Sequence, residues 1–413
     1  MGIRLIKLSL YLNYIVFAMI LGSIGAVILQ SMTTFDLTKV EASVLELFKD
    51  LSVIIFTLFI GSYLPRIGIK RSMLIGLALV TIGLLIMPIA SAFWATKLLF
   101  ALAGVAFGLV KVSVMSVMGL VTNTTREHNS LMSSVEGTYM LGLLGGYILF
   151  GYFIGESLPA DTSWLNVYWV LATLSSLTFI VVWFAELDES EAKKESKDVQ
   201  GSAFFAMFRL LLKPIVLFFA LSIFTYVLIE QGISTWLPTF NKEVLYLANN
   251  LSVQFVSILA AASAIGRLVA GQLVKHIRWF TLMSGSLFCV ALLIVLTLPL
   301  TYNLEIITIT EWRKAPLAAF TFPLLFFFLS PIYPIINSVV LSSLPKHEHS
   351  KMGTLIVLFS ALGGTSGSIA TAFIFSIFGG QTAFYLAIFP IILLVIYLFM
   401  MNKKMNEAKK EAV

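Results

Sequence analysis

The chain has 413 residues, of which 59% are hydrophobic and only 12% are charged, with a formal net charge of +6. A soluble domain carries about 25% charged residues, so this composition excludes a water-soluble protein and favours a chain immersed in a lipid bilayer. The single cysteine excludes a disulfide framework. The basic residues gather at the ends of apolar stretches, which indicates contact with lipid headgroups and not nucleic-acid binding.

Long apolar stretches recur along the chain, and a helix needs about 20 such residues to cross the hydrocarbon layer. The stretches are too long for barrel strands and lack their alternation. The sequence therefore predicts an all-α membrane protein with twelve transmembrane helices, at residues 9–29, 43–64, 72–93, 97–121, 130–153, 164–185, 213–237, 251–274, 279–300, 317–343, 351–377 and 382–401.

Lysine and arginine are distributed unequally between the two sides of the predicted bundle. One side carries most of them, and the other has only Lys39, Lys97, Lys242, Arg313 and Lys314. The richer side is cytoplasmic by the positive-inside rule. We therefore expect a multi-pass protein of a bacterial-type inner membrane, with both termini in the cytoplasm, which requires an even number of spans.

The chain has a twofold internal plan. A polar hinge at 125–130 separates the fourth and fifth spans, and a similar hinge at 346–350 separates the tenth and eleventh. Glycine followed by a basic turn comes after both the second and the eighth span, at 61–71 and 271–278. Two matching six-span halves in one membrane protein are typical of transporters.

The repeat divides the chain into two six-helix bundles. The charged stretch that follows the sixth span has the composition of a cytoplasmic linker, without catalytic content. We predict an N-terminal bundle at 1–185, a linker at 186–212 and a C-terminal bundle at 213–413.

The loop after the second span resembles the loop signature of the major facilitator superfamily. The positions that match are Gly61, Leu64, Arg66, Gly68, Lys70 and Arg71. Pro65 stands where the family has an acidic residue that latches the loop to a neighbouring helix. The resemblance implies two pseudo-symmetric six-helix bundles that work by alternating access. It also implies a cytoplasmic gate at this loop and at Arg267.

A finer resemblance links the chain to the fucose–galactose–glucose–proton symporter branch. It rests on residues 29–30, 35–38, 230–240 and 266–267. That branch carries an aspartate in span one and a glutamate in span four for proton coupling. Here Gly25 stands at the first position and Val110 or Lys111 at the second, so both carboxylates are missing.

Charged residues inside the spans are the candidates for chemistry, because a central Lys or Asp costs about 2.5–3.5 kcal/mol on insertion scales. In the first half these are Glu46, Lys49, Asp50, Lys111 and Glu136. One interpretation treats Lys49–Asp50 or Lys111–Glu136 as neutralising pairs that stabilise helix packing. In the other, Asp50, Glu136 or Glu46 exchanges a proton, and Lys49 or Lys111 contacts the solute.

Polar residues of the spans supply the other candidates for solute binding: Gln30, Glu230, Gln231, Tyr333 and Asn337. Tyr333 and Asn337 lie beside Pro331 and Pro334, and this spacing predicts a bent tenth span that lines the path of the solute.

No motif indicates an enzyme, a metal site or a cofactor. A phosphate-binding loop of the Gly-x-x-x-x-Gly-Lys type does not occur, so a proton gradient is the expected energy source. The sequence predicts a monomeric carrier for a small, sugar-like solute in the lipid bilayer, working by proton symport. Two alternatives stay open: a carrier of organic anions such as carboxylates, suggested by Lys49 and Lys111, and an exporter of amphipathic compounds.

Overall fold

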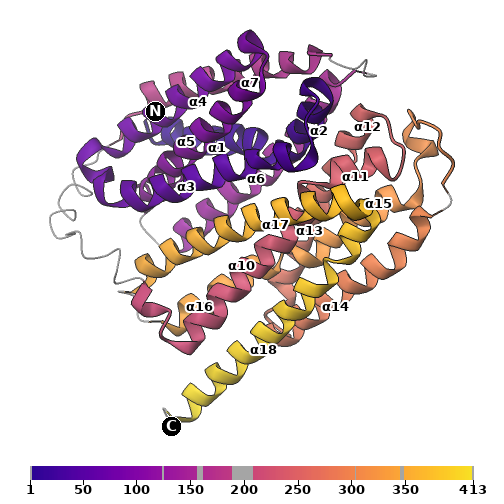
Figure 1. Ribbon diagram of the computed structural model, residues 1–413. Coiled ribbons are helices and arrows are strands. Elements are labelled where there is room, and N and C mark those ends of the chain that lie inside the picture. The colour runs from indigo at the N-terminus through magenta and orange to yellow at the C-terminus, as the bar shows by residue number, and fades with distance from the viewer. Residues whose placement is uncertain are drawn as a thin grey trace. The chain divides into compact units, whose positions relative to one another are not determined.

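The structure is a computed structural model that describes residues 2–122, 125–155, 161–187, 208–302, 304–344 and 348–411. It is almost entirely helical (Figure 1), and its described residues form no strand beyond an isolated bridge between Leu247 and Ile309. The chain divides into two compact units. The first unit is Met1–Leu37 with Val44–Gly201, and the second is Thr38–Ser43 with Ser202–Val413. Residues 188–207 of the predicted linker lie outside the described residues.

In the first unit, α1 packs against α6 and α7, and α4 packs against α5 and α7. Figure 1 shows these helices in indigo and purple. The helices are α1 (Gly2–Gly22), α2 (Ile24–Phe35), α3 (Lys39–Ile67), α4 (Ile69–Ala90), α5 (Phe93–Leu120), α6 (Thr125–Phe153), η1 (Ser163–Asn166) and α7 (Val167–Phe184).

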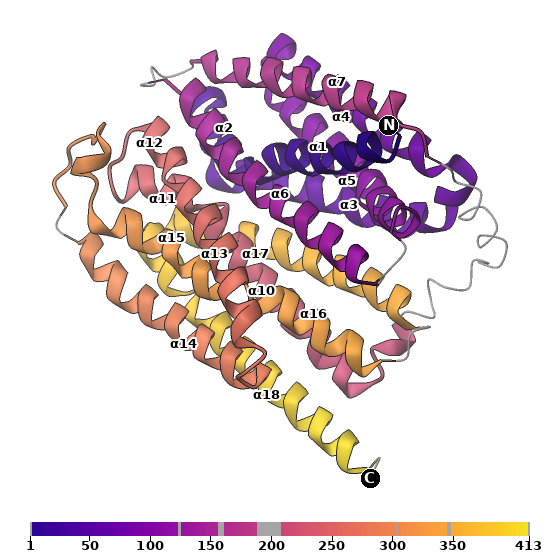
Figure 2. The ribbon, with the colours of Figure 1, turned by 180° about the vertical axis from the view of Figure 1, so that it is seen from behind.

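In the second unit, α10 packs against α17 and α18, and α15 packs against α13 and α14 (Figure 2). The helices are α10 (Pro214–Ser234), α11 (Leu237–Glu243), α12 (Asn249–Gln254), α13 (Val256–Leu273), α14 (Trp279–Thr297), η3 (Leu298–Thr301), η4 (Trp312–Lys314), α15 (Leu317–Leu329), α16 (Ile332–Ser343), α17 (His349–Tyr385) and α18 (Ile388–Glu411).

All twelve predicted spans coincide with helical segments, which confirms the all-α membrane fold. Among the described residues, ten segments are long and apolar enough to cross a membrane. The other two predicted spans, 43–64 and 130–153, are α3 and α6, each with 29 residues. At 1.5 Å per residue each is about 44 Å long, which exceeds the hydrocarbon thickness. Both contain the charged residues that lower their mean hydropathy.

Proline and glycine interrupt two of the second unit's spans. The tenth span is split into α15 and α16 on either side of Ser330 and Pro331, as the prolines of this span predicted. Gly379 has a φ of +82°, a conformation that favours glycine, and it turns the chain between the eleventh and twelfth spans.

Glycines allow α10 and α17 to approach at backbone distance. A Cβ atom added to Gly363 would overlap the carbonyl oxygen of Phe224, and one added to Gly367 would overlap that of Leu228. In the first unit, Gly142 of α6 lies in the same way against the backbone of α1. Small residues at these contacts place the polar groups of adjacent helices close together.

Hydrogen bonds connect the end of α2 to η1 in the first unit. The Thr34 hydroxyl donates to the Asp161 carbonyl at 3.1 Å and accepts from Trp164 Nε1 at 3.0 Å. The Ser163 side chain and backbone N–H donate to the Asp161 carboxylate at 2.7 and 2.8 Å, and these bonds hold the pKa of that carboxyl below its ordinary value. The hydrogen bonds from Ser163 therefore favour the ionised form of the Asp161 carboxyl group.

Candidate functional site

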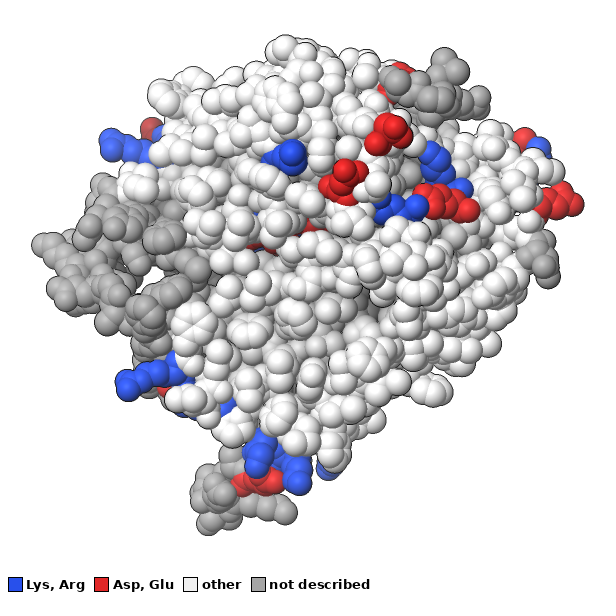
Figure 3. Space-filling model, viewed as in Figure 1, with Lys and Arg blue, Asp and Glu red and all other residues white. Residues whose placement is uncertain are grey.

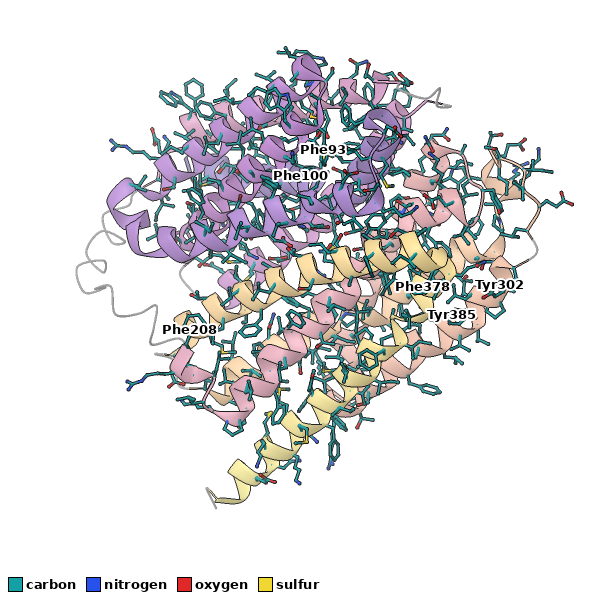
Figure 4. The ribbon with its side chains drawn as sticks, in the orientation of Figure 1. Phe93, Phe100, Phe208, Tyr302, Phe378 and Tyr385 are labelled. Atoms are coloured by element: carbon teal, nitrogen blue, oxygen red, sulfur yellow. The ribbon has the colours of Figure 1, made fainter. Side chains whose placement is uncertain are left out.

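The outer surface of the molecule suits a lipid environment. The face drawn in Figure 3 is largely free of charge, with Lys, Arg, Asp and Glu confined to a few places. Large apolar side chains cover exposed positions, as with Phe378 of α17 at 62% exposure, whereas Phe100 of α5 is 1% exposed inside the first unit (Figure 4). A charged group that is buried within one of the units is therefore unusual and is a candidate for a functional role.

Three charged side chains of α3 form such an exception, named here the acid–lysine cluster: Glu46, Lys49 and Asp50. Their exposed fractions are 0%, 7% and 8%. Lys49 Nζ donates a hydrogen bond to Glu46 Oε2 and lies 3.4 Å from Asp50 Oδ1. One helical turn brings them together, because residues three and four apart share a helix face. With all three ionised, the cluster carries a net charge of −1.

The acid–lysine cluster is backed by α5. A Cβ atom added to Gly104 of α5 would overlap the carbonyl oxygen of Lys49 and lie 2.8 Å from the Ser52 side chain. The glycine thus allows α5 to cover α3 at the level of the buried charges. The pairing predicted between Lys49 and Asp50 is present, and the structure adds Glu46 as the closer partner.

Lys111 and Glu136 do not form the other predicted pair. No ion pair within 4.0 Å joins these two described residues. Lys111 Nζ instead lies 5.4 Å from the centroid of the Phe107 ring, one turn earlier on α5, in cation–π range. Glu136 is partly exposed and interacts electrostatically with Tyr14. The two helices make few mutual contacts, which keeps these charges apart.

The second unit holds a polar group drawn from three helices, named here the tyrosine cluster: Tyr226, Glu230, Arg267 and Tyr333. The Tyr226 hydroxyl donates to Glu230 Oε1 at 2.8 Å. The rings of Tyr226 and Tyr333 lie 5.7 Å apart at 38°. The Tyr333 hydroxyl shares a 3.2 Å hydrogen bond with Ser360 of α17. Tyr226 is fully buried, whereas the other three members are partly exposed.

Arg267 belongs to the tyrosine cluster through its charge. It interacts electrostatically with Tyr226 across the boundary between α13 and α10, and its buried Nε has no hydrogen-bond partner among the residues that the structure describes. The preceding Gly266 lies against the carbonyl oxygen of Phe327, where a Cβ would overlap it. The sequence assigned Arg267 to a gate, and the structure shows it interacting with Tyr226, which donates a hydrogen bond to the predicted solute residue Glu230.

The remaining solute candidates lie in different surroundings. Asn337, one turn after Tyr333 on α16, has a buried Oδ1 for which the described part of the chain provides no hydrogen-bond partner. Gln231 accepts a 3.3 Å hydrogen bond from Thr235 of its own helix. Gln30 of α2 is buried in the first unit at 3% exposure, and no described residue forms a hydrogen bond with its Nε2.

The predicted gating loop is described in part. Gly68 has a φ of +96° and precedes α4, which explains the need for glycine there. Lys70 Nζ donates to the Trp183 carbonyl at 2.7 Å, and Arg71 is exposed. The side chains of residues 58–66, which include Gly61 and Arg66, are outside the described part of the structure.

The polar hinges of the sequence repeat are also described only in part, since the side chains of 125–126, 128–130 and 349–350 and the whole of residues 346–347 are outside the described part. In the part of the chain that the structure describes, no group of three His, Cys, Asp or Glu residues has the arrangement of a metal site.

Sequence reasoning identified Tyr333 but missed Tyr226, Tyr14 and Tyr139. Tyr226 lies four residues before Glu230, a spacing that brings side chains together on one helix face and was a usable signal. Tyr14 contacts Tyr139 from another helix, with ring centroids 6.0 Å apart. That contact depends on how α1 and α6 pack, so no local pattern indicates it.

A family model described as the Major Facilitator Superfamily matches residues 10–326. The chain belongs to this superfamily. Proteins of this superfamily are multi-pass membrane transporters, so this protein is a transporter and not an enzyme. No curated protein sequence matches the chain.

Solved transporters share the fold of this superfamily member. A bacterial homologue of the human lysosomal transporter Spinster has a TM-score of 0.74 and 11% identity, covering 97% of this chain and 96% of its own. The nucleoside transporter NupG has a TM-score of 0.73 and 13% identity, with 98% and 100% coverage. The Escherichia coli fucose:proton symporter FucP has a TM-score of 0.64 and 12% identity, with 97% and 99% coverage. At these identities the likeness concerns the fold alone.

Proposed function

We propose that this chain is a proton-coupled carrier that takes up a small, sugar-like solute across a bacterial inner membrane by alternating access, with both termini in the cytoplasm. The observation that carries the proposal is the acid–lysine cluster, in which two buried carboxylates share one lysine. Buried charges in a membrane protein are costly and mark ion pathways.

The charge balance of the cluster supports proton binding. One lysine faces two carboxylates, so the three buried side chains together carry a net charge of −1 when all are ionised. Taking up one proton makes the cluster neutral and lowers the cost of burying its charge. Asp50 is the member we propose as the proton acceptor, because it lies farther from Lys49 than Glu46 does and its side chain is 12% exposed. Glu46, at 0% exposure, acts as the permanent partner of Lys49.

The tyrosine cluster supports a neutral, hydroxyl-rich solute. Glu230 and Arg267 cancel in charge, and both can bind hydroxyl groups. The partly exposed ring of Tyr333, which packs against the buried ring of Tyr226, offers an aromatic surface, and ligand sites commonly combine such surfaces with a few placed polar groups. The fucose:proton symporter and the nucleoside transporter that share the fold are named for solutes with a hydroxylated ring. We propose Asn337 and Gln231 as additional contacts.

An organic anion is the second candidate, and it rests on Lys111. This lysine makes no ion pair among the described residues, so it could bind a carboxylate. Lys49 gives no such support, because two carboxylates already surround it and an anion would meet net negative charge.

Uptake into proteoliposomes tests the proposal. Radiolabelled fucose, uridine and succinate are offered with an acidic outside, and then after a protonophore collapses the pH gradient. We expect one of the two neutral solutes to accumulate only with the gradient, and Asp50→Asn to abolish accumulation. Asp36→Asn, at an exposed left-handed position that asparagine tolerates, is the matched control. Accumulation that survives collapse of the gradient refutes proton symport, and accumulation of succinate alone favours the anion carrier.

A further inference from the structure

Two hydroxyl groups from different helices of the second unit lie side by side. The hydroxyls of Tyr333 on α16 and Ser360 on α17 are 3.2 Å apart and share one hydrogen bond, in which either oxygen can be the donor. Both residues are partly exposed, and the bond between them is only partly buried. We name these two residues the hydroxyl pair. They are 27 residues apart in the chain, so no local pattern indicates their contact.

Contacts with other helices hold the tyrosine of the hydroxyl pair in place. The Tyr333 ring packs against the ring of Tyr226 on α10, 5.7 Å away, and the Tyr226 hydroxyl is in turn bonded to Glu230. Tyr333 also lies in the first turn of α16, directly after the break in the tenth span. At this break the Ser330 hydroxyl donates to the Ser263 carbonyl of α13 at 3.0 Å. The ring and the backbone of Tyr333 are therefore both restrained.

The serine of the hydroxyl pair lies on the face of α17 that packs against α10. Ser360 precedes Gly363 by three residues and Gly367 by seven, so the three share one helix face. A Cβ atom added to either glycine would lie 2.2 Å from a carbonyl oxygen of α10. This close packing fixes α17, and with it Ser360, against α10. The two hydroxyls are thus arranged in advance, which lowers the ordering cost of binding a ligand.

The surroundings of the hydroxyl pair indicate a path for solute and not a surface that faces lipid. Glu230 accepts a hydrogen bond from Tyr226, Arg267 interacts with Tyr226 electrostatically, and both charged residues are partly exposed. Charged groups within spans face the bundle interior or a water-filled path, because lipid cannot hydrate them. One turn after Tyr333, the buried Oδ1 of Asn337 has no hydrogen-bond partner among the described residues, and a solute hydroxyl can supply one.

We propose that the hydroxyl pair binds two adjacent hydroxyl groups of the solute, a vicinal diol, an inference that rests on the proposed uptake of a neutral, hydroxylated solute. Each hydroxyl has one hydrogen to donate and two lone pairs that accept. The bond between Tyr333 and Ser360 uses one of their two hydrogens, so the pair keeps one donor and several acceptors. Two adjacent hydroxyls of a ring can accept from that donor and donate to the neighbouring oxygen. A single hydroxyl leaves one of these bonds unmade.

Thermal-shift titrations of the full-length protein in detergent micelles test the diol with matched solutes. The probes are uridine with 2′-deoxyuridine, and fucose with its 2-deoxy and 3-deoxy analogues, which between them interrupt every vicinal pair of ring hydroxyls. We expect the parent solute that binds to lose about tenfold in affinity in at least one analogue, the scale of one hydrogen bond. In Ser360→Ala and in Tyr333→Phe the parent weakens and that analogue does not, so the two bind alike.

Ser376→Ala is the matched control. It makes the same change on α17, at an exposed serine whose hydroxyl donates to the Phe373 carbonyl of its own helix. This variant should keep the wild-type affinities for the parent solute and for its analogues.

The outcomes separate the diol site from the proposed function. If neither uridine nor fucose binds the wild type, the proposed uptake of a sugar-like solute is wrong, and the diol site fails with it. A parent that binds no better than its analogues refutes the diol site alone. Discrimination that survives Ser360→Ala also refutes it, and equal weakening of parent and analogue is such a case, because it indicates a structural role. If either variant does not fold, the other decides by the same criterion.

Discussion

Replacing Lys49 by methionine is the most direct perturbation of the acid–lysine cluster. It removes the positive charge and leaves Glu46 and Asp50 as two buried carboxylates within one helical turn. Breaking a buried ion pair by removing one partner costs about 3–5 kcal/mol, because the remaining charge loses its compensation. We expect Lys49→Met to lower the free energy of unfolding by this amount. The cost arises mainly at Glu46, whose side chain is 0% exposed and cannot recover water contacts.

Reversible unfolding in mixed detergent micelles measures this free energy. Adding Glu46→Gln to Lys49→Met removes the stranded charge and restores at least half of the lost stability. Lys314→Met is the matched control, because it breaks an ion pair with Glu311 whose side chains are 68% and 57% exposed. Exposed pairs contribute at most about 1 kcal/mol. A cost below about 1 kcal/mol for Lys49→Met, or a double variant no more stable than the single one, refutes the buried cluster as the source of stability.

Three further predictions concern transport and packing. Glu136→Gln should abolish gradient-driven accumulation in proteoliposomes while sparing solute exchange; unchanged accumulation removes Glu136 from the proton path. Glu230→Gln should weaken binding of the neutral solute about tenfold in a thermal-shift titration, since a bond to a charged group contributes about 1.5–3 kcal/mol, and unaltered binding refutes the tyrosine cluster as the solute site. Gly363→Ala forces a methyl group against the Phe224 carbonyl and should lower the free energy of unfolding by about 1–3 kcal/mol. Gly285→Ala is the control, because its added methyl group meets open space and should have no measurable effect. Equal melting temperatures for the two variants contradict the packing argument.

The helical spans were predictable because the hydrocarbon layer imposes a local rule. A chain in lipid must satisfy its backbone hydrogen bonds internally, so each apolar stretch of sufficient length becomes a helix. The break at Pro331 was predictable for a similar reason, since proline lacks the backbone donor. Family membership followed from the loop signature at 61–71, and the family model confirms it over 10–326. Assignment to the fucose–galactose–glucose–proton branch stays a prediction.

The sequence by itself determined the contacts that one helix makes within itself. Glu46 shares a helix face with Lys49 and Asp50, which lie three and four residues further on, whatever the rest of the fold does. Only the tertiary structure decided which helices exchange charges. It separated Lys111 from Glu136, because α5 and α6 make few contacts. It also brought Arg267 to Tyr226, because contacts between helices depend on the shape of whole helix surfaces and not on any local spacing of residues.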